Sequence, residues 1–141
     1  MDQEVKREII MDNYLNPKNK IRIEDSSYDK VNSNNESCID NIDIFVKVKE
    51  GIIEDIKFDG EACAISTSST SIMINNLIGL NISEAIKYID NFDNMVNEKD
   101  YDRELINEAI VYEDIYKQNN RKHCALLPYI GIRKVLEKYR K

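Results

Sequence analysis

The stretch "IDIFVKVKEGIIEDIKFDGEAC", residues 42–63, decides the fold, because it has the period of β-structure and its flanks do not. Alternate positions are apolar from Ile42 to Val48, and the alternation returns around Ile56 and Phe58. Such a period of two is typical of strands. The residues between the two runs, Lys-Glu-Gly, have the composition of a turn. The stretch therefore predicts an antiparallel hairpin whose second strand ends at Gly60.

Helical patterns flank the hairpin. Apolar spacing over residues 3–15 predicts a first helix that ends at Asn16-Pro17, and the polar residues 18–37 are expected to form a loop. Four helices are expected after the hairpin. The first runs from Cys63 to Ile78 and is closed by Gly79, and the second runs from Asn81 or Ser83 through Met95. The third starts at Asp102, with Leu105, Ala109, Tyr112 and Tyr116 on one stripe, and the fourth follows His123, with Ile132, Val135, Leu136 and Tyr139 facing inward. This order predicts a single α+β domain over residues 1–141.

Composition narrows the function classes. A net charge of −6 in 141 residues disfavours nucleic acid as a partner, because phosphate backbones are bound through basic patches. No window has the long apolar run of a membrane span, and "MDQEVKREII" has no apolar signal core, so we expect a cytoplasmic protein without membrane contact. Three cysteines, an odd number, argue against a disulfide framework. Buried inert thiols, metal ligands and reactive thiolates remain as alternatives.

The cysteines fall at the edges of the expected elements. Cys38 lies in the polar segment before the first strand, Cys63 opens a helix, and Cys124 opens the last helix beside the sole histidine, His123. A helix N-terminus favours the thiolate, and three thiolates with the carboxylate of Asp40 or the imidazole of His123 would supply the four donors of a zinc site. They also suit an iron–sulfur cluster. Each residue also has an ordinary alternative: Cys38 as an incidental loop thiol, Cys63 as a core cysteine, Asp40 as a capping residue and His123 as a surface residue.

Three segments in order resemble the SufU/IscU/NifU N-terminal family of iron–sulfur cluster assembly proteins: "YLNPKNK" (14–20), "SCIDNIDIFVKVKEGIIEDIKFDGEACAIS" (37–66) and "RKHCALLP" (121–128). The resemblance covers most of the chain and is closest to SufU-type members, which carry an insertion like residues 85–111. It implies a small antiparallel sheet of about three strands with helices packed on one face.

The same resemblance implies the site. Four residues fall on the family's metal ligands: Cys38, Asp40, Cys63 and Cys124. Arg121 matches an arginine that SufU-type members carry before the last cysteine, and His123 stands where IscU-type members have a histidine ligand. Ile39 and Ala62 replace family glycines. If those glycines have positive φ, we expect a cost of about 1–2 kcal/mol for a branched side chain.

The activity implied is that of a zinc-dependent sulfur acceptor, a sulfurtransferase that takes persulfide sulfur from a SufS-like cysteine desulfurase. We expect Cys38 to accept the sulfur, with Cys124 as the alternative and Arg121 in a supporting role, and we expect Cys63 to be a ligand only. A second hypothesis is a scaffold that builds a [2Fe–2S] cluster on Cys38, Cys63, Cys124 and His123 and passes it to apo iron–sulfur proteins. A third is a structural zinc module whose thiols do not react.

Overall fold

The hairpin is present in the computed structural model, which describes residues 1–35 and 39–140. Strands β2 (Asn41–Lys49) and β3 (Ile52–Glu61) pair antiparallel, with Ile44 opposite Phe58. The turn between them uses positive φ at Glu50 and Gly51, 54° and 77°. A third strand, β1 (Asp29–Asn34), pairs antiparallel with β2 and gives the sheet order β1-β2-β3.

Strand β1 corrects the expectation of a loop over residues 18–37. Its residues, "DKVNSN", carry little apolar signal, because only one strand borders it and most of its side chains remain accessible. Ser33 is its buried position, and the Ser33 hydroxyl donates to the carbonyl of Leu127 at 2.6 Å. A polar residue can therefore anchor this edge strand, and hydrophobic alternation does not reveal it.

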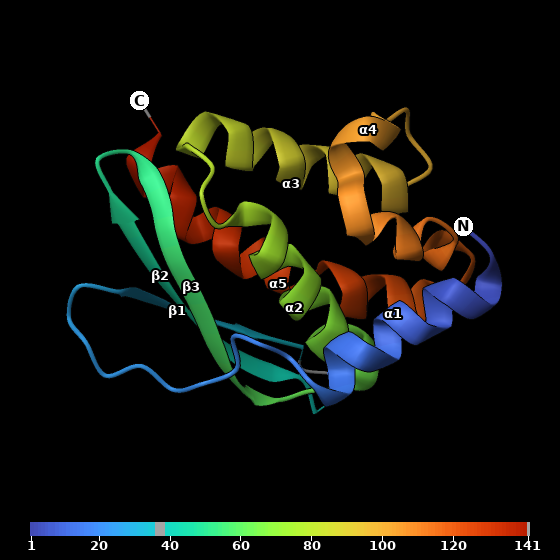
Figure 1. Cartoon of the computed structure of the whole chain (residues 1–141), viewed down its shortest axis with the longest axis horizontal. Helices are drawn as coiled ribbons and strands as arrows, with labels where there is room; N and C mark the ends of the chain where they lie inside the picture. The colour runs from blue at the N-terminus through green and yellow to red at the C-terminus, as the bar shows by residue number, and fades with distance from the viewer. Residues whose placement is uncertain (36–38, 141) are drawn as a thin grey trace.

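The helices lie together on one side of the sheet (Figure 1). The long ones are α1 (Gln3–Leu15), α2 (Ala64–Leu77), α3 (Ile82–Val96) and α5 (Asn119–Leu136). Shorter turns are α4 (Arg103–Ile106) and the 3₁₀ segments η1 (Asn107–Tyr112), η2 (Ile115–Lys117) and η3 (Glu137–Tyr139). The predicted α+β class, with helices on one face of a small antiparallel sheet, is confirmed. No helix within residues 1–35 and 39–140 is long and apolar enough to cross a membrane.

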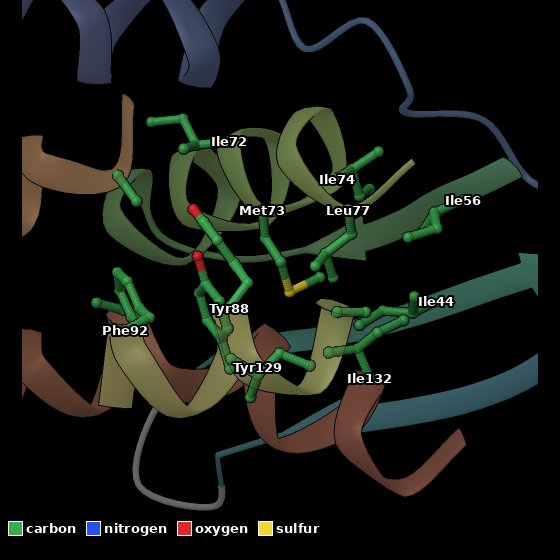
Figure 2. Close-up of a cluster of buried hydrophobic side chains, with 14 of the residues drawn as sticks. Ile44, Ile56, Ile72, Met73, Ile74, Leu77, Tyr88, Phe92, Tyr129 and Ile132 are labelled. Atoms are coloured by element: carbon green, nitrogen blue, oxygen red, sulfur yellow. The ribbon is translucent and has the colours of Figure 1, made fainter. Parts of the chain in front are cut away.

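The core fixes α2 and α5 relative to the sheet. Figure 2 shows Met73 and Leu77 of α2 beside Ile44 of the sheet and Ile132 of α5, all fully buried. Farther out, Phe92 of α3 stacks on Tyr129 of α5, with ring centroids 4.0 Å apart and planes 7° apart. Since α2 begins beside Cys63 and α5 carries Cys124, this packing holds the two thiols in place.

The run of serine and threonine residues in α2 is entirely buried between α1 and α5. The Ser69 hydroxyl donates to the Ala125 carbonyl at 2.7 Å, and the Ser71 hydroxyl donates to Asn13 Oδ1 at 2.7 Å. Such bonds satisfy the hydroxyls, and the small side chains allow close approach of the neighbouring helices. This explains a buried helix of poor helix formers.

Two expectations for the second half of the chain are wrong. The helix expected from Asp102 stops at Ile106, because Asn107 has a φ of +51°, and a 3₁₀ segment follows. The last helix begins at Asn119 rather than after His123 and ends at Leu136. Tyr139, expected to face inward, lies beyond it and is 37% exposed.

Candidate metal centre

Cys63 lies at the junction of β3 and α2. It is the N-cap of α2, and its Sγ accepts the backbone N–H of Ser66 at 3.4 Å. The approach to this junction depends on Gly60, whose φ is +136°. A Cβ at Gly60 would lie 2.2 Å from the carbonyl oxygen of Asn41, which a side-chain-bearing residue could not tolerate. Gly60 thus lets the end of β3 pass close to the segment that carries Asp40.

Asp40 precedes β2, and its side chain is 1% exposed. Its Oδ1 accepts the backbone N–H of Cys63 at 2.7 Å, and its Oδ2 accepts the hydroxyl of Ser66 at 2.6 Å. Two hydrogen bonds therefore orient a buried carboxylate toward the start of α2. A buried carboxylate needs such donors or a cation to offset its loss of water.

Cys124 lies in the second turn of α5 and not at its N-terminus, which corrects the expectation from sequence. The helix start therefore cannot lower its pKa as we expected. Burial, and next the neighbouring Cys63, raise the pKa of the Cys124 thiol to about 12. Pro128, one turn later, has no N–H for the Cys124 carbonyl, and Ser66 Oγ lies 3.2 Å from that oxygen.

Ser66 thus contacts all three of these residues, and sequence analysis missed it. Its hydroxyl is fully buried and lies within hydrogen-bond distance of Asp40 Oδ2, Cys63 Sγ and the Cys124 carbonyl. A serine three residues after a helix-capping cysteine was the signal available in the sequence. This spacing places the third residue of the helix beside the cap.

The donor atoms of Asp40, Cys63 and Cys124 lie within 4.8 Å of one another. Two thiols and one carboxylate are the donor types of tetrahedral zinc sites, so this set fits zinc and leaves one position for a fourth ligand. Cys38, the fourth ligand expected from sequence, lies outside the described residues. His123 is exposed and is not a member of this group, although it adjoins Cys124 in α5.

Ala62 and Ile39 stand where the family has glycines near the centre. Ala62 does not have positive φ; among non-glycine residues of the described chain, only Glu50, Glu98 and Asn107 do. The expected cost concerned a branched side chain at a glycine position with positive φ, and position 62 does not have that backbone conformation. Ile39 is 74% exposed, so its side chain extends away from the interior rather than into the centre.

Known proteins resemble this chain over most of its length. Residues 5–141 match the family model of the NifU-like N-terminal domain. The chain belongs to this family. A SufU of Bacillus subtilis (strain 168), named a zinc-dependent sulfurtransferase, is 35% identical over 133 residues, which are 94% of this chain and 89% of that protein. An IscU of Thermotoga maritima, named an iron–sulfur cluster assembly scaffold protein, is 30% identical over 104 residues, 74% of this chain and 73% of the relative.

A solved structure gives the same result for the fold of this NifU-like chain. The crystal structure of a putative iron–sulfur cluster assembly scaffold protein for the SUF system, FiSufU of Fervidobacterium islandicum AW-1, superposes with a TM-score of 0.86 at 33% identity. The match covers 92% of this chain and 94% of the other. The chain is therefore an iron–sulfur cluster assembly protein of the SufU/IscU family, and its partners belong to that assembly machinery.

Proposed function

We propose that the chain is a zinc-dependent sulfur acceptor that takes persulfide sulfur from a cysteine desulfurase. The observation that carries the proposal is the cluster of two thiols and one buried carboxylate within 4.8 Å. The Bacillus subtilis relative, aligned over 94% of this chain, is named a zinc-dependent sulfurtransferase. In the proposal Asp40, Cys63 and Cys124 hold the metal together with Cys38. Bound zinc would keep its thiolates deprotonated at neutral pH.

Asp40, Cys63 and Cys124 differ in how readily their surroundings would let them leave the metal and react. Asp40 is held by the Cys63 amide and the Ser66 hydroxyl, so it is suited to remain in place. Cys63 caps α2, and its release would also remove the cap of that helix. Cys124 caps no helix; like Cys63 it is half-buried and borders an open groove, so a partner can reach it. Cys63 is thus a ligand in this proposal, and the sulfur acceptor is one of the other two thiols.

We propose Cys38 as the acceptor, because the sequence places it in the polar segment before the first strand, with Cys124, the acceptor that IscU-type members suggest, as the alternative. The acceptor thiolate attacks the outer sulfur of the desulfurase persulfide, a new S–S bond forms, and the old S–S bond breaks to release the desulfurase thiolate. No further oxidant or reductant is needed. Arg121, exposed in the first turn of α5, supports this step by favouring the thiolate of the acceptor.

A scaffold for a [2Fe–2S] cluster is the second candidate. The observation that favours it is the exposed His123 beside Cys124, since an imidazole near three thiolates allows exchange of one ligand for another. The Thermotoga maritima relative is named a scaffold protein. In this candidate the cluster passes to apo iron–sulfur proteins.

One experiment separates the two. Cysteine desulfurase turnover is measured with and without the chain, and the metal content of the same sample is determined. Zinc together with stimulated turnover supports the acceptor, and an iron-containing chromophore that transfers to an apo-protein supports the scaffold. Unchanged turnover with the zinc-loaded chain would refute the acceptor function. If Cys38→Ala still accepts persulfide at the wild-type rate, the assignment of Cys38 fails, and Cys124→Ser then tests the alternative.

A further inference from the structure

Cys63 and Cys124 border a groove of about 690 Å³ between α1, the start of α2 and the start of α5, which we call the thiol groove. Its lining comes from α1 (Gln3, Lys6, Arg7, Ile10, Met11), from residues 63–65, and from η1, η2 and the first turns of α5 with their flanks (Val111, Asp114, Ile115, Gln118, Asn120, Arg121, Cys124). Small-molecule sites usually have roughly 300–1,000 Å³, so the groove has the size for a ligand.

The charged side chains that line the groove are Lys6, Arg7, Arg121 and Asp114, so its balance is positive although the chain has a net charge of −6. Lys6 is neutralised by Asp114 at 3.2 Å and Glu113 at 3.5 Å. Arg7 and Arg121 form no ion pair with any residue in the described part of the chain. Two guanidinium groups therefore remain for an anion, and Arg side chains suit carboxylates through paired N–H donors.

The rest of the lining specifies more of the ligand. Ile10, Ile65 and Ile115 provide an apolar wall that suits an aliphatic body. The two thiols place sulfur chemistry at the same groove. A molecule with carboxylates for the arginines, an aliphatic body for the wall and a thiol for the cysteines meets all three features. A longer acidic peptide would meet only the first.

We propose that the thiol groove binds a small anionic thiol, a carboxylate-bearing molecule of about tripeptide size, and that this thiol removes sulfane sulfur from Cys124. The ligand thiolate attacks the outer sulfur of Cys124–S–SH, an S–S bond forms, and the bond to Cys124 breaks. Cys124 leaves as thiolate, and the proton stays on the outer sulfur of the ligand persulfide. The transfer rests on the alternative within the proposed function, in which Cys124 rather than Cys38 carries the sulfur; binding in the groove rests on neither assignment.

Binding is tested with S-methylglutathione, which keeps the carboxylates and cannot react, by calorimetric titration of the full chain. We expect saturable binding that weakens about threefold in Arg7→Gln and about tenfold in Arg7→Gln/Arg121→Gln, and that falls with added salt. The control is Lys87→Gln, which removes the same charge from an exposed position on α3 outside the groove. Equal affinity in Arg7→Gln and Lys87→Gln overturns the proposal. So does binding of an acidic decapeptide without binding of S-methylglutathione, which assigns the groove to a protein partner.

Transfer is tested without a desulfurase, so that its failure is distinct from failure of the proposed function. The chain is loaded with sulfane sulfur by inorganic polysulfide, and the persulfide on the peptide that contains Cys124 is followed by mass spectrometry. We expect its discharge by glutathione to saturate with concentration and to slow about threefold in Arg7→Gln at low concentration. Discharge by neutral 2-mercaptoethanol should be equal in both proteins. Linear, Arg7-independent discharge by glutathione overturns the transfer.

Discussion

Ser66→Ala removes one hydroxyl that contacts Asp40 at 2.6 Å and the Cys124 carbonyl at 3.2 Å. The single O–H of Ser66 donates to Asp40, which is the shorter contact. Asp40 keeps its bond from the Cys63 amide, but a buried carboxylate that loses this donor costs roughly 1.5–3 kcal/mol. Alanine returns about 0.5 kcal/mol through its higher helix propensity. We therefore expect the free energy of unfolding of the metal-free protein to fall by about 2 kcal/mol.

The same change should weaken metal binding, because the hydroxyl orients Asp40. Residues that hydrogen-bond to metal ligands typically contribute about 10–100-fold to metal affinity, so we expect the zinc affinity to fall at least roughly tenfold. Urea denaturation of the metal-free protein gives the stability, and competition with a chromophoric chelator gives the affinity.

Ser69→Ala is the matched control, since Ser69 lies one turn further along α2 and donates to the next carbonyl of α5, that of Ala125. That carbonyl keeps the helical donor of Tyr129, so the loss should be about 0.5 kcal/mol with unchanged zinc affinity. If Ser66→Ala and Ser69→Ala have equal effects on both quantities, Ser66 does not organise the centre.

Three further outcomes are expected. In urea denaturation, Gly60→Ala should lower the free energy of unfolding by about 3 kcal/mol, because the new Cβ would meet the Asn41 carbonyl. Gly51→Ala, with open space around it, should lower it by about 1–2 kcal/mol. Equal losses would contradict the close approach of Gly60 to the Asn41 carbonyl. Cys63→Ser should keep the stability of the metal-free protein, because serine also caps helices, while Cys63→Ala should lose about 1 kcal/mol. Both variants should bind zinc more weakly, since each lacks one sulfur ligand; unchanged zinc affinity in either would exclude Cys63 as a ligand. The pKa of Cys124 is raised to about 12 without metal, so its thiol is protonated at neutral pH and must release that proton to bind zinc. The apparent zinc affinity, measured by chelator competition, should therefore rise at least about tenfold per pH unit between pH 6 and 8. A zinc affinity independent of pH would show that the Cys124 thiol is not a ligand.

The sequence predicted correctly those features that depend on local residue patterns, such as apolar alternation in strands and polar caps at helix starts. Alternation over residues 42–60 predicted the hairpin, whose second strand ends at Glu61, one residue after the predicted Gly60. Of the two predicted helix starts, Asn81 and Ser83, Asn81 is the cap. Cys63 was placed correctly at the start of α2 for the same reason. These features depend on local backbone geometry, which short stretches of sequence encode directly.

Other features depend on tertiary contacts and were missed. Strand β1 is polar because α5 satisfies its buried serine, and Lys6 is buried in α1 because Asp114 pairs with it. Cys124 lies inside α5 because that helix begins at Asn119, and the missing N–H of Pro128 leaves the Cys124 carbonyl as an acceptor beside Ser66. Neither apolar spacing nor the position of a proline reveals which distant hydroxyl or carboxylate will form a hydrogen bond or ion pair with a buried polar group.

The resemblance of three short segments to the SufU/IscU/NifU family supplied the ligand set that spacing alone left open. Of that set, Asp40, Cys63 and Cys124 lie together in the structure. Spacing could not have joined them, since Asp40 precedes β2, Cys63 begins α2 and Cys124 lies in α5.

X-ray absorption at the zinc edge of the purified protein tests the central claim most directly. The account requires one zinc per chain, with about three sulfur ligands near 2.3 Å and one oxygen ligand near 2.0 Å. Cys124→Ser should lower the sulfur count by one. A zinc coordinated without sulfur, or the same spectrum in wild type and Cys124→Ser, would contradict a metal centre built on Asp40, Cys63 and Cys124.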